Sequence, residues 1–263
     1  MERQATELND VDTAMARLIE ARAFLPRLLA RLSPYLPLTP GDPVLDVGAA
    51  QGVAVTAFLE AGFRARGVEP SKEALATRAD LVARTGIDTD IVEGLAERLP
   101  FPDREFQYVH SYSVMEHVLD PWAVFREAYR VLRPGGGFFF STSSAICPRQ
   151  VEISWWPLFP WYPDRVRRTI MEWAARNHPA MVGHTQTPAV WWYKHREVRR
   201  RLREVGFSQI FDMWQLRAAS GEATGWRRMV IESAAGNRAA QGIGNLMVPG
   251  MEYLAIRPSA DRA

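Results

Sequence analysis

The sequence contains a single cysteine, Cys147, so neither an internal disulfide nor a cysteine-based zinc site can form. Lysine is nearly absent as well, because Lys72 and Lys194 are the only two and arginine supplies the other positive charges. No run of about 18 apolar residues occurs, so we expect no membrane-spanning helix. The N-terminal stretch lacks the basic start and apolar core of a signal peptide, which favours a cytoplasmic protein.

Charge of one sign is also lacking. The 263-residue chain has 32 basic and 30 acidic residues, a formal net charge of +2 that gives no electrostatic reason to expect a nucleic-acid partner. Its 47% apolar and 24% charged residues are ordinary for a globular protein. The acidic residues and histidines are dispersed and do not have the spacing of a ligand set, so we expect no metal.

A stretch rich in proline and glycine, PYLPLTPGDP at 34–43, divides the chain into two parts. Apolar residues within 8–32 recur at helical spacing and predict one or two helices in an N-terminal helical segment, 1–38. The remaining residues, 39–263, are expected to form one larger domain.

Short apolar runs alternate with helical patterns through this larger part. Strands are expected at 43–47, 64–68, 89–93, 106–111, 136–142, 207–214 and 251–257. Helices are expected at 52–60, 72–84, 121–132 and 195–205. This alternation predicts an α/β fold with a doubly wound, mostly parallel seven-stranded sheet and an antiparallel last strand. Two segments interrupt it, the tryptophan-rich 145–193 and the partly glycine-rich 219–249, and both are interpreted as insertions that form a helical and aromatic cap.

The first predicted strand ends in a glycine-containing turn, DVGAAQG at 46–52, before a helix. Glycines allow a sharp turn and a close approach of backbone to a ligand, and the helix N-terminus offers unpaired N–H groups. Glu69 ends the second strand, 21 residues after Gly48, where a carboxylate can accept two hydrogen bonds from a ribose diol. Dinucleotide enzymes use the same pattern, and a tight turn without a ligand is also compatible with it.

Three further motifs extend this pattern: GVEP at 67–70, the segment 94–117 (GLAERLPFPDREFQYVHSYSVMEH) and RVLRPGGG at 130–137. In this order, and following LDVGAAQG, they resemble the class I S-adenosylmethionine-dependent methyltransferases. The branch they resemble most includes ubiquinone-type, sugar and other small-molecule O-methyltransferases. The resemblance implies a Rossmann-like fold and S-adenosyl-L-methionine as cofactor.

The resemblance also implies roles for individual residues. Asp46 and Gly48 would lie beside the methionine portion of the donor. Glu69 would hold the ribose hydroxyls, and the backbone N–H of Ala96 would meet the adenine. The full implied donor site is Asp46, Gly48, Ala49, Gly52, Glu69, Pro70, Ser71, Ala96, Glu97, Ser111 and Tyr112.

Three positions depart from the pattern of the family. Ala50 stands where a second glycine is usual, and Gln107 stands where an aspartate is frequent. Leu95 replaces an acidic residue that reads the adenine amino group, which puts the affinity for adenine in question.

Methyl transfer to a hydroxyl usually requires a base, and histidine is the commonest choice. His184, in the tryptophan-rich insertion, and His117, just after the fourth strand, are the candidate catalytic residues. His110 lies within a strand, where a packed core histidine is as plausible as a site residue. His195 begins an arginine-rich helix and is expected to face water.

Aromatic side chains of the insertion are the natural wall of an acceptor pocket, because rings stack on sugars and bury apolar surface. The residues proposed for this wall are Trp155, Trp156, Trp161, Tyr162, Trp192 and Tyr193. A lid whose rings only pack on the sheet is the alternative.

The sequence therefore favours O-methylation of a hydroxyl on a sugar, glycolipid or natural-product acceptor. N- or C-methylation of a small molecule stays open, as does a non-catalytic nucleotide-binding protein of the same fold. A nicotinamide oxidoreductase is less favoured because no Tyr-x-x-x-Lys pair occurs. A peripheral membrane contact and a homodimer are compatible with the sequence.

Overall fold

The computed structural model of the chain describes residues 11–150, 153, 156, 158–178, 188–221 and 223–260. Its strands are β1 Pro43–Val47, β2 Arg64–Glu69, β3 Asp90–Glu93, β4 Phe106–Tyr112, β5 Leu132–Ser143, β6 Gln209–Asp212 and β7 Gly250–Ile256. Its helices are α2 Val11–Leu32, α3 Val53–Glu60, α4 Lys72–Thr85, α5 Pro121–Val131, η1 Phe159–Trp161, α6 Asp164–Asn177, α7 His195–Val205, α8 Met213–Ser220, α9 Gly225–Gly236 and α10 Arg238–Met247.

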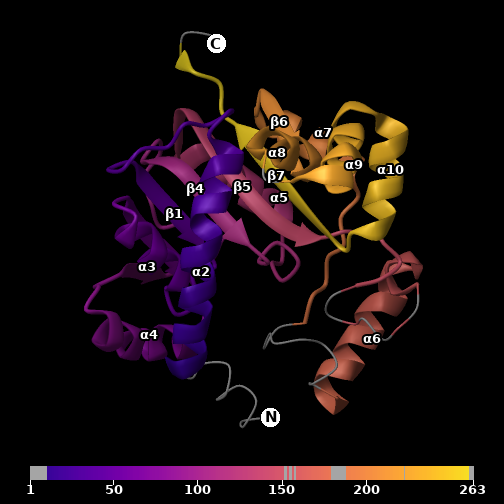
Figure 1. Cartoon of the computed structure of the whole chain (residues 1–263). Helices are drawn as coiled ribbons and strands as arrows, with labels where there is room; N and C mark the ends of the chain where they lie inside the picture. Colours follow the sequence, from indigo (N-terminus) through magenta and orange to yellow (C-terminus); the bar gives the residue numbers. More distant parts are fainter. Residues whose placement is uncertain are drawn as a thin grey trace.

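The described strands form one seven-stranded sheet in the order β3-β2-β1-β4-β5-β7-β6 (Figure 1). Strands β1 to β5 pair in parallel, and β7 runs antiparallel to both of its neighbours. The chain winds from β1 out to β3, returns beside β1 as β4, and then builds the other half of the sheet. The predicted fold class, with its antiparallel last strand, is confirmed.

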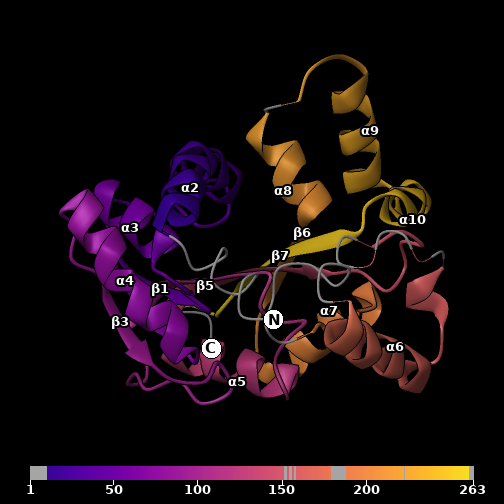
Figure 2. The same ribbon diagram turned by 90° about the horizontal axis from the view of Figure 1, so that it is seen from below.

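Helices cover both faces of the sheet, with α2 and α8 on one and α5 and α7 on the other (Figure 2). Each face has its own hydrophobic core, because the strands are buried on both sides. On one face, Phe125 of α5 and Leu202 of α7 pack against Phe138. On the other, α2 is a single helix that contributes Leu18 and Leu28 to the core despite the proline at position 26.

Two elements differ from their predicted form. The strand predicted at 207–214 ends at Asp212, because this side chain accepts the backbone N–H groups of Trp214 and Gln215 and starts helix α8. The glycine-rich end of the 219–249 insertion, to which no helix of its own was assigned, forms α10, whose N-terminus is capped by Asn237. In both cases a capping side chain decided the local structure, and periodicity did not reveal it.

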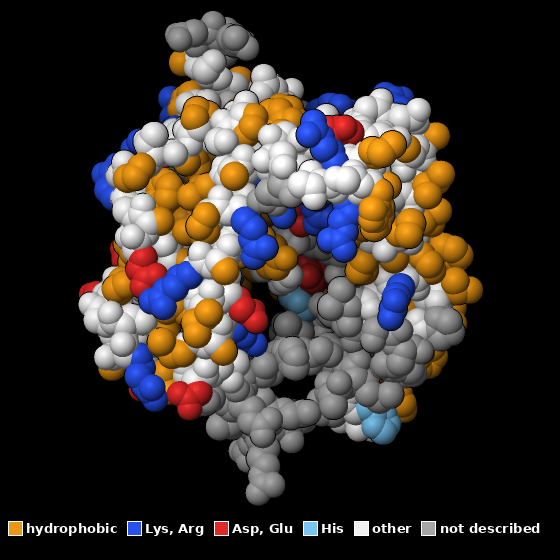
Figure 3. All heavy atoms as spheres, viewed as in Figure 1, with side chains coloured by type: hydrophobic (Ala, Val, Ile, Leu, Met, Phe, Trp, Pro, Cys, Tyr) orange, Lys and Arg blue, Asp and Glu red, His pale blue; other side chains and the backbone are white. Residues whose placement is uncertain are grey.

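The surface over α9 and α10 is unusually apolar, as the orange spheres of Figure 3 show. Its exposed large side chains are Trp226, Met229, Val230, Ile243, Leu246 and Met247. Among the described helices, none is both long enough and apolar enough to cross a bilayer.

Candidate active site

The turn between β1 and α3 is a concave stretch of backbone that we call the first-turn cradle, residues 48–52. Gly48, Ala50 and Gly52 have positive φ angles of 78°, 46° and 92°. A Cβ on Gly48 would lie 2.3 Å from a methyl carbon of Val114, so only glycine fits there without displacing that loop. Ala50 occupies the left-handed region at a cost of roughly 1–2 kcal/mol, which fits its place where the family resemblance leads us to expect glycine.

Glu69 joins the cradle to the next turn of the same sheet edge. One of its carboxylate oxygens accepts the backbone N–H of Ala50 at 2.9 Å, and the other accepts the N–H of Ser71 at 2.9 Å. Ser71 in turn caps helix α4 with its hydroxyl. The predicted donor residues Gly48, Gly52, Glu69 and Ser71 therefore lie along one continuous rim, at the carboxyl ends of β1 and β2, where ligands bind in folds of this kind.

Asp46 lies inside this rim with only 4% of its surface exposed. Burial raises its pKa from 3.8 to about 7, and the neighbouring negative charge of Glu69 acts in the same direction. Asp46 therefore exchanges its proton near neutral pH, and a cationic group bound beside it would favour the ionised form.

The segment after β3 contains two predicted donor residues, Ala96 and Glu97, which lie in different environments. Ala96 is buried, and its neighbour Glu97 directs its carboxylate to the backbone N–H of Leu119, at 2.7 Å. Glu97 thus anchors the loop before α5. Leu95 is 53% exposed, which leaves its apolar side chain at the surface where the family resemblance leads us to expect an acid.

The end of β4 supplies Ser111 and Tyr112. Ser111 is fully buried, and its hydroxyl has no hydrogen-bond partner among the described residues. Tyr112 is half exposed, and its ring lies edge-on to Phe24 of α2 with 5.6 Å between centroids. The N-terminal helix therefore reaches the edge of the candidate donor site. His117 follows, half-buried, with its backbone N–H bonded to the carbonyl of Val114.

The other described histidines are engaged elsewhere. His110 is buried, contacts the Tyr108 hydroxyl at 3.1 Å and has its pKa lowered to about 4 by burial. The expectation that His195 faces water is wrong, because its Nδ1 lies 2.7 Å from the hydroxyl of Tyr253 and burial lowers its pKa to about 4. His178 is exposed at the end of α6. His184 lies outside the described residues.

The aromatic residues proposed for the acceptor wall occupy three environments. Trp156 and Tyr162 are hydrogen-bonded to each other at 3.3 Å, and Trp161 is 54% exposed. Trp192 is 8% exposed and belongs to a small separate core with Phe159 and Met171 of the cap.

Tyr193 is 2% exposed within the main core, where its hydroxyl donates to the carbonyl of Met115. In this structure Trp192 and Tyr193 are packing residues, and Trp161 is the most exposed of the described wall candidates. Trp155 lies outside the described residues.

Comparison with known proteins assigns the central part of the chain to a protein family. Residues 45–140 match the family described as "Methyltransferase domain". A class I S-adenosylmethionine-dependent methyltransferase domain is therefore present.

Two curated relatives are similar to part of this chain. The 27-O-demethylrifamycin SV methyltransferase of Amycolatopsis mediterranei is 34% identical over 128 residues, 48% of this chain and 46% of that protein. The ubiquinone biosynthesis O-methyltransferase of Pseudomonas entomophila is 35% identical over 106 residues, 39% of this chain and 44% of that protein. The match thus spans less than half the length of each relative.

Among solved structures, phosphoethanolamine N-methyltransferase 2 of Haemonchus contortus, in complex with S-adenosyl-L-methionine, superimposes with a TM-score of 0.57. The two are 18% identical, and the superposition covers 89% of this chain and 53% of that one. At this level of identity the likeness concerns the fold.

Sequence reasoning missed one residue within the methyltransferase domain that organises the site. Glu116 is buried, accepts the hydroxyl of Thr142 at 2.8 Å, and its backbone carbonyl accepts the N–H of Val190 and of Trp191. It thereby ties the returning end of the 145–193 insertion to the loop that carries His117. An acid between Met115 and His117 was the available signal, but spacing gives no indication of a contact 26 residues away.

Proposed function

We propose that the chain binds S-adenosylmethionine at the first-turn cradle and transfers its methyl group to a hydroxyl of a small acceptor. The observation that carries this proposal is the placement of Glu69, whose two oxygens hold the N–H groups of Ala50 and Ser71 beside the cradle. The methyltransferase domain match over residues 45–140 supports it.

The residues present fit the donor. Each oxygen of Glu69 retains a lone pair that can accept from a ribose hydroxyl. The buried hydroxyl of Ser111 lacks a partner among the described residues, so it is available to a polar group of the donor. Asp46, with its pKa near neutrality, would ionise beside the donor's ammonium group.

The donor supplies a methyl group already activated by its sulfonium, so the protein must chiefly align the acceptor oxygen with that carbon. A hydroxyl acceptor also has to lose its proton, and we assign this step to His117 or His184. His110 and His195 are unsuited, because burial lowers the pKa of each to about 4 and each is bonded to a tyrosine hydroxyl. The curated relatives are named as O-methyltransferases or as acting on a 27-O-demethyl compound, which favours oxygen over nitrogen or carbon.

Calorimetric titration with S-adenosylhomocysteine, and separately with NAD, tests donor recognition. We expect the homocysteine compound to bind and NAD not to bind. Binding of NAD alone would indicate an oxidoreductase, and binding of neither would indicate a protein of this fold that is not a methyltransferase.

The acceptor and the base are tested together once donor binding is established. Hydroxylated sugars, glycolipids and phenolic natural products are screened for release of S-adenosylhomocysteine. With an acceptor found, His117→Gln should lower the turnover rate by about 10²–10⁴-fold and remove the acidic limb of the pH–rate profile. An unchanged rate and profile would exclude His117 as the base, and the same measurement on His184→Gln would follow.

A further inference from the structure

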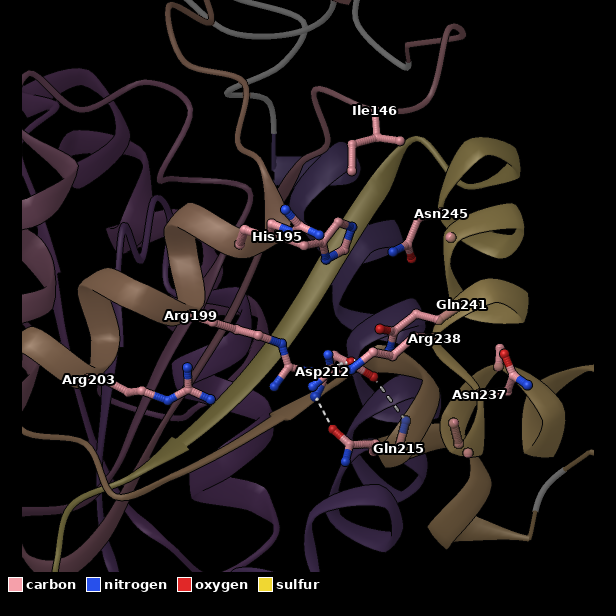
Figure 4. A pocket seen from close by; sticks show the side chains of 15 residues that line it. Ile146, His195, Arg199, Arg203, Asp212, Gln215, Asn237, Arg238, Gln241 and Asn245 are labelled. Carbon is pink, nitrogen blue, oxygen red and sulfur yellow. Dashed lines mark hydrogen bonds and ion pairs between the residues drawn. The ribbon is translucent and has the colours of Figure 1, made fainter.

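A cavity of about 650 Å³ lies at the β6 edge of the sheet, between α7, the end of β6 and α10 (Figure 4). We call it the arginine pocket. It is outside the methyltransferase domain match, and its described ionisable lining residues are Arg196, Arg199, Arg203, Arg238, Asp212 and His195. Its volume is in the range of small-molecule sites.

Among the described lining residues of the arginine pocket, the one carboxylate, that of Asp212, is already used by its neighbours. One oxygen of Asp212 caps α8, and the other accepts from Gln241 at 2.6 Å and pairs with the guanidinium of Arg199. Asp212 is 2% exposed. Its negative charge is therefore balanced by Arg199 and is not available to the other arginines.

Three guanidinium groups remain around the cavity. Among the described residues, none forms a hydrogen bond or an ion pair with the side chain of Arg196, Arg203 or Arg238. Arg203 extends from α7 and Arg238 from α10, on opposite sides of the cavity (Figure 4). Arginine presents a rigid fork of donors, so such a convergence suits an oxyanion with several oxygens.

A buried amide adds an uncharged donor. Asn245 is 6% exposed, and its Oδ1 accepts the indole N–H of Trp214 at 2.8 Å. That bond fixes the orientation of the amide. Its NH₂ group therefore faces the cavity (Figure 4). No described residue accepts from this group, so a ligand oxygen is the partner that it lacks.

The charge of the arginine pocket does not depend on histidine. The Nδ1 of His195 lies 2.7 Å from the Tyr253 hydroxyl, and burial keeps its pKa near 4. The described lining thus carries four arginines against one aspartate.

The arginine pocket is separate from the candidate donor site. In the sheet register, Ser111 of β4 pairs with Phe140, Phe140 with Tyr253, and Tyr253 with Asp212. Three strand spacings therefore separate Ser111 from Asp212, which is ~14 Å. A ligand in the pocket and a donor in the cradle can be bound at the same time.

We propose that the arginine pocket binds the phosphate group of a phosphate ester, whose remaining part occupies the rest of the cavity. A phosphate monoester carries nearly two charges and three acceptor oxygens, which match three free guanidinium groups. A carboxylate has one charge and two oxygens and would leave part of the lining unsatisfied. The proposal is independent of the methyl-transfer function.

Calorimetric titration at low ionic strength with glucose 6-phosphate, gluconate and glucose tests the proposal. These probes share a six-carbon chain and differ in the anionic group, and gluconate is also open-chain where the other two are rings. We expect glucose 6-phosphate to bind at least about tenfold more tightly than gluconate, and glucose not to bind. Absence of binding at millimolar glucose 6-phosphate, or tighter binding of gluconate, would overturn it.

Variants locate the binding. The double variant Arg203→Gln/Arg238→Gln should weaken glucose 6-phosphate binding by at least about 30-fold. Asn245→Asp keeps the acceptor for Trp214 but adds a negative charge to the cavity. This variant should bind glucose 6-phosphate at least about tenfold more weakly. Arg200→Gln, on the same helix but paired with Glu204 at the surface, is the matched control and should stay within about twofold.

Urea unfolding, measured on the same samples, reports whether each variant is intact. If Arg200→Gln loses as much affinity as the double variant, the attraction is a general surface effect and the proposal is overturned. If the double variant is unstable, Asn245→Asp decides alone, and unchanged phosphate binding in that variant contradicts the assigned site.

Discussion

The first-turn cradle is made of backbone, whereas the arginine pocket is made of long side chains. In the cradle, Gly48 and Gly52 have positive φ, and Glu69 fastens one turn to the next. In the pocket, α7 and α10 bring Arg203 and Arg238 to one cavity although they lie 35 residues apart in the chain. A backbone site depends on local sequence and is readable as a motif, while a side-chain site depends on which helices meet.

The strongest contrast between the two regions concerns buried titratable groups. Asp46 in the donor region has its pKa raised from 3.8 to about 7. Folding therefore retains a proton that the unfolded chain has lost, and this group costs stability as the pH rises from about 4 to 7, by at most about 4 kcal/mol.

His195 in the pocket has the opposite sign, because burial lowers its pKa from 6.5 to about 4. The unfolded chain binds the extra proton, so this group costs stability as the pH falls from about 6.5 to 4, by at most about 3 kcal/mol. Urea unfolding is measured from pH 4 to 7. As the pH rises, the free energy of unfolding of Asp46→Asn should increase relative to that of the wild type, and that of His195→Asn should decrease. His110 is common to all three proteins and cancels in the differences. If the stability of all three proteins changed with pH in the same way, the opposite effects assigned to Asp46 and His195 would be contradicted.

The backbone character of the cradle is tested by Gly48→Ala. The new Cβ would displace Val114, on the loop that carries the end of β4. We expect affinity for S-adenosylhomocysteine to fall by at least about 100-fold, or about 2.7 kcal/mol, in calorimetric titration. Gly86→Ala is the matched control, because Gly86 also has a positive φ but nothing lies within 4 Å of its added Cβ. Equal losses in both variants would attribute the effect to backbone strain alone.

The role of Glu69 is tested by Glu69→Gln. The amide keeps the shape of the side chain but replaces one acceptor oxygen with a donor, opposite either Ala50 N–H or Ser71 N–H. Affinity for S-adenosylhomocysteine should fall by about 30-fold, since a hydrogen bond to a charged group contributes about 2 kcal/mol. Glu93→Gln, at an exposed ion pair with Lys72, should leave the affinity unchanged, and an equal loss there would indicate a general charge effect.

The smallest expected effect is a gain. Leu95→Asp restores the acidic residue that the family resemblance leads us to expect near the adenine amino group, on a side chain that is now 53% exposed. One added hydrogen bond should tighten S-adenosylhomocysteine binding by about fivefold, or about 1 kcal/mol. The same measurement with S-inosylhomocysteine, which lacks that amino group, should show no gain. A gain with both compounds would mean that the introduced carboxylate acts through its charge alone.

Much of the fold was predictable from local patterns. The bounds predicted for β1 and α7 agree with the structure residue for residue, since short apolar strands and an amphipathic helix have a clear periodicity. The start of α8 at Met213 was not predictable, because it depends on Asp212 accepting two N–H groups at the end of a strand. The fold of α10 depended in the same way on Asn237.

The candidate sites divide along the same line. Sequence motifs located Gly48, Glu69 and Ser111 at one edge of the sheet, because parallel strands end there together. The environment of His195 was mispredicted, since an arginine-rich helix gives no indication that β7 places Tyr253 against its first residue. Tyr193 was proposed as an acceptor residue, yet the fold buries it against Met115.

The sequence by itself determined the succession of the seven strands, the first-turn cradle and the acid that fastens it, because each depends on residues adjacent in the chain or on strand ends that the α/β pattern aligns. Tertiary structure alone decided which histidines are buried, which tryptophans stay accessible, and that Arg196, Arg203 and Arg238 surround one cavity with Asn245. The physical reason is that side-chain environment is set by contacts between helices far apart in sequence, and periodicity carries no record of those contacts.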